Sequence, residues 1–154
     1  MPEKIASFTV DHDKITEGMY ISRIDGDVIT YDLRTRIPNA GDYMDTLTIH
    51  SVEHMIATYI RSSAIGDGVL YFGPMGCRTG FYLLVRDRYT PRAVYDALIA
   101  CLQQTVAHTG EMFGASRKEC GNYRELSLDA ARQECARYLA ALTACPPTDF
   151  KYAL

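Results

Sequence analysis

Two histidines and a glutamate lie close together in the segment His50-Ser51-Val52-Glu53-His54. Residues three and four positions apart share one face of an α-helix, so this spacing places both imidazoles and the carboxylate side by side. Two histidines four apart can bind one metal ion, with Glu53 next to it as a proton-transfer group. H-x-x-E-H is the inverted form of the zinc-peptidase motif. Taken alone, the pattern is equally compatible with two ordinary helix histidines.

The other faces of this predicted helix are apolar, which indicates that it is buried: Ile49, Val52, Met55, Ile56, Tyr59 and Ile60. Polar side chains on a buried helix need partners, and a metal ion is one such partner. A catalytic metal needs a third protein ligand and keeps a further position open. Cys120, in a glycine-containing loop before the last predicted helix, is the best candidate. A His₂Cys set suits zinc or ferrous iron, and it leaves Glu53 available as a general base.

Cys77 is the second cysteine placed for chemistry, because glycines flank it in Met75-Gly76-Cys77-Arg78-Thr79-Gly80. A thiol near a divalent cation and Arg78 would ionise more readily than usual and could move protons near neutral pH. The alternative is a small residue that fills a tight glycine turn, which composition alone favours by about two to one.

Two further histidines are weaker candidates. His108 falls at the end of a predicted helix, where an imidazole can satisfy helix carbonyls, so a structural role is preferred. His12 follows Asp11 at the end of a predicted strand. We expect His12 to be either a surface residue or a ligand for substrate.

Composition narrows the class of protein. The chain has 154 residues, of which 47% are hydrophobic, the length and content of one domain with a core. No apolar run could span a bilayer, and the N-terminus lacks the apolar stretch of a signal peptide, so we expect a soluble, cytoplasmic protein. A net charge of −3 with interspersed signs offers no basic patch for nucleic acid. The five cysteines should be free thiols, with Cys101 and Cys135 buried.

Hydrophobic periodicity and turn residues predict where the strands and helices lie. Strands are expected at residues 7–10, 20–21, 28–34, 69–72 and 81–85, with a hairpin turn at Asp25-Gly26. Helices are expected at about 48–62, from Thr90-Pro91 to Gly110, and from Ser127 to Pro146. This order indicates an α+β single domain over residues 1–154, with a mostly antiparallel sheet covered by helices.

Together, these motifs closely resemble the LuxS family of S-ribosylhomocysteine lyases. The resemblance covers roughly the whole chain, in family order: Ser7-Phe8-Thr9-Val10-Asp11-His12, Asp32-Leu33-Arg34, Pro38-Asn39, His50-Ser51-Val52-Glu53-His54, Pro74-Met75-Gly76-Cys77-Arg78-Thr79-Gly80-Phe81-Tyr82 and Cys120-Gly121-Asn122. It implies a LuxS/metallohydrolase-like fold in which His50, His54 and Cys120 hold one divalent metal per subunit. Ferrous iron is the metal of the family, with zinc or cobalt as substitutes.

The resemblance also implies roles for other residues. Glu53 and Cys77 would be the two acid/base residues, and Arg34 would help to shape the site around Cys77. Ser7 and His12 match positions that reach the substrate from the neighbouring subunit, because family members are homodimers with active sites at the interface. No nucleic-acid or membrane partner is implied.

The reaction implied by the resemblance cleaves the thioether S-ribosylhomocysteine. Successive enolisations move the sugar carbonyl along the chain, with Cys77 moving a proton between the first two carbons. Glu53 then removes a proton, and homocysteine leaves by β-elimination. The other product is 4,5-dihydroxy-2,3-pentanedione, the precursor of autoinducer-2. One segment departs from the family: Tyr71-Phe72-Gly73 stands where many members carry an acidic residue and a serine that contact the homocysteine end.

Two other functions compete with this interpretation. An H-x-x-E-H metallopeptidase would take its third ligand from a downstream glutamate, and Glu111, Glu119 and Glu125 are available. It would have no use for Cys77, and the short chain leaves little for a second, peptide-binding domain. A non-catalytic metal-binding module would use His50, His54 and Cys120 as a structural site, which normally has four protein ligands.

Overall fold

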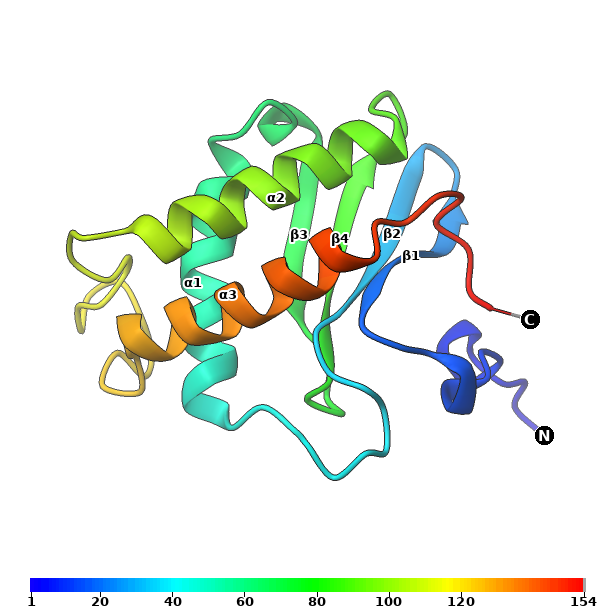
Figure 1. Cartoon of the computed structure of the whole chain (residues 1–154), viewed down its shortest axis with the longest axis horizontal. Helices are drawn as coiled ribbons and strands as arrows, with labels where there is room; N and C mark the ends of the chain where they lie inside the picture. The colour runs from blue at the N-terminus through cyan, green and yellow to red at the C-terminus, as the bar shows by residue number, and fades with distance from the viewer. Residues whose placement is uncertain (154) are drawn as a thin grey trace.

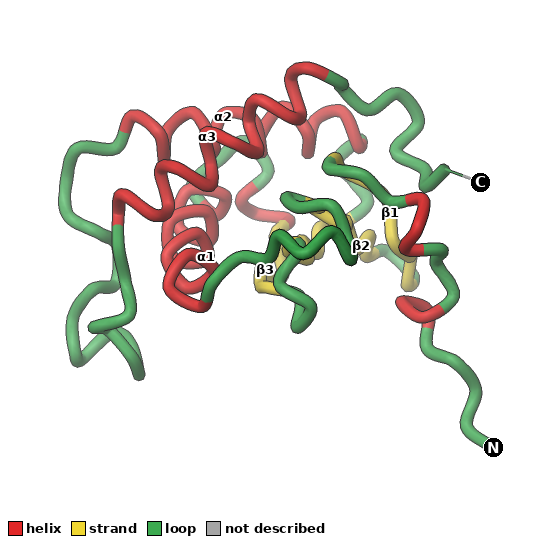
Figure 2. Tube along the Cα trace, turned by 60° about the horizontal axis from the view of Figure 1, so that its bottom comes forward, coloured by secondary structure: helices red, strands yellow, loops and turns green. Residues whose placement is uncertain are grey.

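The computed structural model describes residues 1–153. Four antiparallel strands form one sheet in the order β1-β2-β4-β3: β1 (Gly18–Asp25), β2 (Val28–Arg34), β3 (Val69–Pro74) and β4 (Gly80–Arg86). The three α-helices α1 (Thr46–Arg61), α2 (Pro91–Ala107) and α3 (Leu128–Ala144) lie together on one face of this sheet (Figures 1 and 2). The α+β prediction is therefore confirmed.

The hydrophobic core lies between the helices and the sheet. Side chains alternate between the two faces of a strand, so every second residue of the central strands faces the helices. These residues are all buried: Ile29, Tyr31, Leu33, Phe81, Leu83 and Val85. Between them, Asp32 and Arg34 of β2 point to the other face, yet they are only 1% and 2% exposed. These two buried side chains carry opposite charges and pair with each other.

Side-chain caps fix where the helices begin. The oxygen atoms of Asp45, Thr90 and Ser127 accept hydrogen bonds from the first turns of α1, α2 and α3. The predicted start of α2 at Thr90-Pro91 is confirmed. The helix ends at Ala107, ahead of the predicted Gly110, because His108 takes an extended backbone conformation and closes the last turn.

The strand predicted at residues 7–10 is wrong. The chain instead forms two short 3₁₀ helices, η1 (Ala6–Phe8) and η2 (His12–Lys14). The amides of Phe8 and Thr9 donate to carbonyls three residues earlier, which closes turns in place of sheet hydrogen bonds. Phe8 remains 69% exposed, so the alternating pattern that indicated a strand does not face a core.

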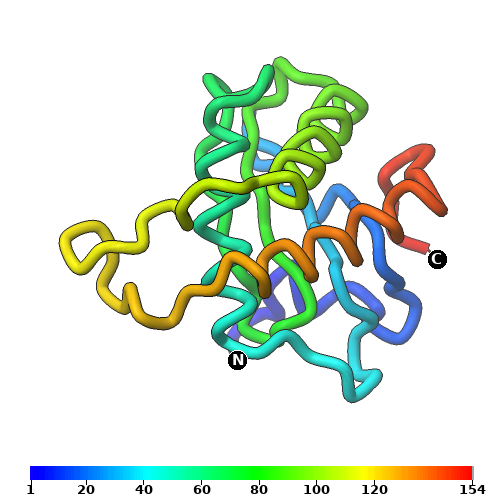
Figure 3. The backbone as a smooth tube through the Cα atoms, turned by 60° about the vertical axis from the view of Figure 1, so that its left-hand side comes forward, coloured from blue at the N-terminus to red at the C-terminus, as the bar shows by residue number. Residues whose placement is uncertain are grey.

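Two connections contain the cysteines that the sequence indicates as candidates for chemistry. The connection between α2 and α3, residues 108–127, extends away from the helices and returns along α1 (Figure 3). It includes Cys120. The tight turn between β3 and β4, residues 75–79, includes Cys77. In residues 1–153, no helix has the length and apolar character needed to cross a membrane.

Candidate metal centre and reactive thiol

The structure brings His50 and His54 of α1 together with Cys120 of the connection between α2 and α3. One donor atom of each residue lies within 4.8 Å of the other two, and all three residues are half-buried. The Cys120 sulfur is 3.3 Å from Nε2 of His50. Two imidazoles and a thiol at this spacing form a donor set that suits a divalent transition metal. The two histidines predicted to share one face of α1 and the predicted third donor, Cys120, therefore lie together in the structure.

Main-chain carbonyls orient both imidazole rings. Nδ1 of His50 lies 2.9 Å from the Glu125 carbonyl oxygen, and Nδ1 of His54 lies 2.8 Å from that of Phe113. A carbonyl oxygen can only accept, so each Nδ1 bears the proton and each Nε2 presents its lone pair to the cluster. Such carbonyl partners fix the tautomer and the ring direction that metal ligands need. The residues present therefore fit a bound metal ion.

The same connection approaches α1 closely at two further points. Gly114 has φ +66°, and a Cβ there would lie 2.9 Å from Nδ1 of His54. Only glycine combines this backbone conformation with this close approach. The Ser51 hydroxyl accepts from the Ser127 amide at 2.8 Å, which anchors the far end of the connection to α1. Sequence reasoning missed these contacts, although the lone glycine beside Phe113 was a signal.

Glu53 lies beside the cluster without belonging to it. Its side chain lines a pocket of about 340 Å³ whose other lining residues are His54, Ala57, Thr58, Tyr71, Phe72, Phe113 and Gly114. A carboxylate that is not a ligand but lies next to a metal can take a proton from a molecule held there. The half-exposed ring of Tyr71 forms part of the wall of this pocket.

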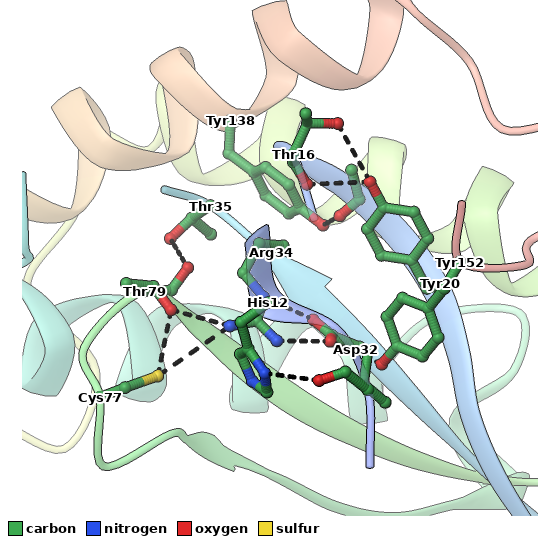
Figure 4. Close-up of polar contacts among 12 residues, drawn as sticks. His12, Thr16, Tyr20, Asp32, Arg34, Thr35, Cys77, Thr79, Tyr138 and Tyr152 are labelled. Carbon is green, nitrogen blue, oxygen red and sulfur yellow. Dashed lines mark hydrogen bonds and ion pairs between the residues drawn. The ribbon is translucent and has the colours of Figure 1, made fainter. Parts of the chain in front are cut away.

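Cys77 lies in a second pocket, of about 310 Å³, lined by Ser7, Phe8, His12, Arg34, Met75, Gly76 and Tyr82. Its sulfur is 3.0 Å from the Thr79 hydroxyl and 4.0 Å from Nη1 of Arg34 (Figure 4). Arg34 also donates to Thr79 at 2.9 Å. The thiol is exposed, with a buried cation behind it. A molecule that enters this pocket can therefore reach the thiol.

The cation beside Cys77 is therefore Arg34, and the expected contribution of Arg78 is wrong. Arg78 has φ +64° in the turn, and its guanidinium lies over the ring of Tyr43 and donates to the Met44 carbonyl. Arg78 is thus engaged by Tyr43 and Met44, whereas Arg34 makes the contact with the thiol. Burial by itself would lower the pKa of Arg34, but the hydrogen bonds and charge of Asp32 raise it above its ordinary value.

Ser7 and His12, predicted at the substrate, line the pocket of Cys77 in the same chain. Nδ1 of His12 lies 2.9 Å from the Val10 carbonyl oxygen, which makes Nδ1 the donor and leaves Nε2 free. Neither residue lines the pocket of Glu53. In the described part of the chain, the metal cluster and the thiol thus line separate pockets.

The remaining predicted residues have structural surroundings. The His108 imidazole does bond locally, but its partners are the Tyr59 hydroxyl at 2.6 Å and the Glu111 carbonyl at 2.8 Å, not the carbonyls of its own helix. Cys101 and Cys135 are buried, as predicted, and burial raises the pKa of each thiol to about 12. All five cysteines are free thiols.

The third donor of the cluster is a cysteine, which weighs against the peptidase interpretation. In residues 1–153 the cluster consists of three residues, and none of Glu111, Glu119 or Glu125 belongs to it. The contribution of Glu125 is its main-chain carbonyl, while its carboxylate accepts from Asn122. Three protein donors also differ from the four that structural zinc sites normally use.

Fold and site together define an α+β protein with a donor cluster that could hold a metal ion, a carboxylate beside that cluster and an exposed thiol in a second pocket. A sequence profile of the S-ribosylhomocysteinase (LuxS) family matches residues 5–147. The S-ribosylhomocysteine lyase of Borreliella afzelii is 40% identical, covering 97% of this chain and 99% of the relative. Those of Clostridium acetobutylicum and Desulfotalea psychrophila are also 40% identical, over 91% and 88% of this chain, and 92% and 89% of the relatives. The chain belongs to the LuxS family.

Proposed function

We propose that this protein is a metal-dependent lyase that cleaves S-ribosylhomocysteine to homocysteine and 4,5-dihydroxy-2,3-pentanedione. The observation that supports this most strongly is the His50, His54 and Cys120 cluster with Glu53 unligated beside it, in a chain of the LuxS family. The full-length similarity to proteins named S-ribosylhomocysteine lyase supports the choice of substrate.

His50, His54 and Cys120 would hold one divalent metal per subunit, with ferrous iron as the proposed metal and zinc or cobalt as substitutes. Bound there, such an ion would supply Lewis acidity toward oxygen atoms of the sugar. The main-chain carbonyls that accept from Nδ1 of each imidazole keep the Nε2 lone pairs directed at the metal position. The protein therefore does not need to reorganise when the substrate arrives.

Cys77 would move a proton between the first two carbons of the sugar, turning the aldose into a ketose. Its exposed sulfur is accessible to a substrate, and Arg34 and Thr79 contact it. A thiolate takes a proton from one carbon and returns it to the next, so no net charge is gained. A second enolisation of the same kind brings the carbonyl to the third carbon.

Glu53 would remove the proton next to that carbonyl. The electron pair left behind forms a carbon–carbon double bond as the carbon–sulfur bond breaks, and the proton is finally returned to homocysteine sulfur. Carboxylate and thiol act at different carbons, which explains why the protein uses both. Tyr71 lies beside Glu53, where it would contact the arm of the substrate that leads to the homocysteine end.

The active unit would be a homodimer in which the pocket of Glu53 in one chain faces the pocket of Cys77 in the other. Each pocket, at about 340 and 310 Å³, lies at the lower end of the range for small-molecule sites, roughly 300–1,000 Å³. Ser7 and His12 lie with Cys77, so they would reach the substrate from the subunit opposite the metal. Two-fold symmetry then gives two identical sites.

The proposed cellular role is cytoplasmic recycling of homocysteine, together with supply of the precursor of autoinducer-2 for quorum sensing. The test is an anaerobic incubation of the iron-loaded protein with S-ribosylhomocysteine, with free thiol followed by a colorimetric reagent. We expect one thiol released per substrate consumed. Failure to release thiol from a correctly metal-loaded dimer would contradict the proposal.

A further inference from the structure

The last residues of the chain contact the ion pair behind Cys77. The Tyr152 hydroxyl donates to Oδ2 of Asp32 at 2.7 Å, and its ring stacks on Tyr20 with centroids 5.0 Å apart (Figure 4). The Phe150 carbonyl accepts from the Ile21 amide at 2.7 Å, and the Phe150 ring is 5% exposed, so the segment is anchored on β1. These residues follow the family match, which ends at residue 147.

Asp32 and Arg34 form a buried, bidentate ion pair. Nε and Nη2 of Arg34 donate to the two carboxylate oxygens at 3.0 and 2.6 Å, and both side chains are at most 3% exposed. Buried ion pairs are held in place by every hydrogen bond they make, since each unpaired atom would be costly. Tyr152 supplies one of these bonds, to the same oxygen that accepts from Nη2 of Arg34.

The opposite side of the Arg34 guanidinium faces the thiol. Nη1 lies 2.9 Å from the Thr79 hydroxyl and 4.0 Å from the Cys77 sulfur. An unbroken chain of contacts therefore leads from Tyr152 through Asp32 and Arg34 to Cys77. The charge that Cys77 experiences depends on how far Asp32 neutralises Arg34.

We infer that Tyr152 is a positioning residue which, through Asp32 and Arg34, sets how readily the Cys77 thiol ionises. A hydrogen bond from the Tyr152 hydroxyl partly offsets the negative charge of the Asp32 carboxylate. Asp32 then neutralises Arg34 less, and the positive charge of Arg34 acts more strongly on the Cys77 sulfur. Burial, followed by the nearby charge of Asp32, raises the pKa of Tyr152, so the hydroxyl keeps its proton and remains a donor. The inference builds on the proposed role of Cys77.

Three other groups share the surroundings of Cys77. His12 from η2 and Tyr82 from β4 line its pocket, and Thr79 contacts its sulfur. Burial, with a contribution from Asp32, raises the pKa of Tyr82, which is therefore neutral near pH 7. Among residues 1–153, none of these three residues forms a hydrogen bond with Tyr152, whose hydroxyl donates to Asp32. A change at Tyr152 therefore reaches Cys77 through Asp32 and Arg34.

The test compares Tyr152→Phe with Tyr20→Phe in the metal-loaded dimer. The first change removes only the hydroxyl that contacts Asp32 and keeps the stacked ring. The second removes a hydroxyl of the same aromatic pair that donates to the Thr16 carbonyl. The rate of iodoacetamide addition to Cys77 is measured across pH by mass spectrometry of its peptide, because the exposed Cys145 also reacts.

We expect Tyr152→Phe to slow alkylation of Cys77 about threefold at pH 7 and to move the midpoint of the pH–rate curve up by about half a unit, since one unit corresponds to a factor of ten. Tyr20→Phe should match the wild type. A chain ending at Phe150 should be slowed at least as much as Tyr152→Phe. Identical curves for Tyr152→Phe and wild type, or equal slowing in Tyr20→Phe, would overturn the inference. Because no substrate is involved, either result would leave the proposed lyase activity untouched.

Discussion

The metal cluster and the thiol pocket are built in different ways. At the cluster, one helix supplies His50 and His54, and main-chain carbonyls of a single connection orient both rings. At the thiol, side chains from the N-terminal turns, β2 and β4 surround Cys77, and the C-terminal segment contacts the Asp32 carboxylate behind Arg34. The first arrangement depends on backbone shape, and the second depends on a network of side-chain charges. Substitutions should therefore affect the two regions differently.

The largest difference should come from loss of a metal donor. Cys120→Ala removes the sulfur donor of the cluster, so we expect bound metal to fall from about one ion per chain to almost none, with activity lost as well. Cys145→Ala is the control, because this exposed cysteine lies outside the cluster. Metal content is measured by plasma emission spectrometry. Full occupancy in Cys120→Ala would reject the donor set.

Loss of either proposed acid/base residue should reduce turnover but spare the metal. We expect Cys77→Ala and Glu53→Gln to keep normal metal content and to lose at least a few hundredfold in turnover, the usual scale for a general acid or base. They should stall at different steps, which NMR of the sugar carbons would distinguish. Glu53→Gln should permit the early isomerisation, whereas Cys77→Ala should block it. Normal turnover in Cys77→Ala would be incompatible with the mechanism.

Backbone shape at the cluster can be tested with two glycines of one connection. Gly114→Ala places a Cβ against His54 at a positive φ, so we expect metal affinity to fall about tenfold, the lower end of the range for outer-shell changes. Gly121→Ala adjoins Cys120 but has open space around its Cβ, so its affinity should be nearly unchanged. Affinities come from competition with a chelator. Equal losses of metal affinity in both variants would contradict the role assigned to the close approach of Gly114 to His54.

The smallest effect is expected at the two buried cysteines outside both regions, which should not react with a thiol reagent in the folded protein. Burial raises the pKa of Cys101 and Cys135 to about 12, so both stay protonated and inert at pH 8. We expect iodoacetamide to label Cys77 and Cys145 in the native protein and to label the buried pair only after unfolding. Peptide mapping checks this, and rapid labelling of Cys101 in the folded state would contradict the assigned core.

The sequence was informative where function depends on local spacing. The i, i+3, i+4 positions of His50, Glu53 and His54 predicted the cluster, and the glycines around Cys120 and Cys77 indicated accessible thiols. The carbonyls behind the imidazoles could not be predicted, because every residue has one. Nor could the contact of Tyr152 with Asp32, which joins residues 120 positions apart. The N-terminal strand prediction failed because alternation at residues 7–10 has no core to face.

The central claim is that the metal of one chain works with the thiol of its partner. Glu53→Gln and Cys77→Ala proteins, each inactive alone, are mixed under conditions of subunit exchange, and thiol release from S-ribosylhomocysteine is measured. If the two pockets come from different chains, random pairing makes half of the dimers hybrid with one intact site each, so activity should recover to about a quarter of the wild type. The control mixture of Cys77→Ala with His12→Ala changes the same pocket twice and should stay inactive. No recovery in the first mixture, despite proven exchange, would show that each chain builds its site alone.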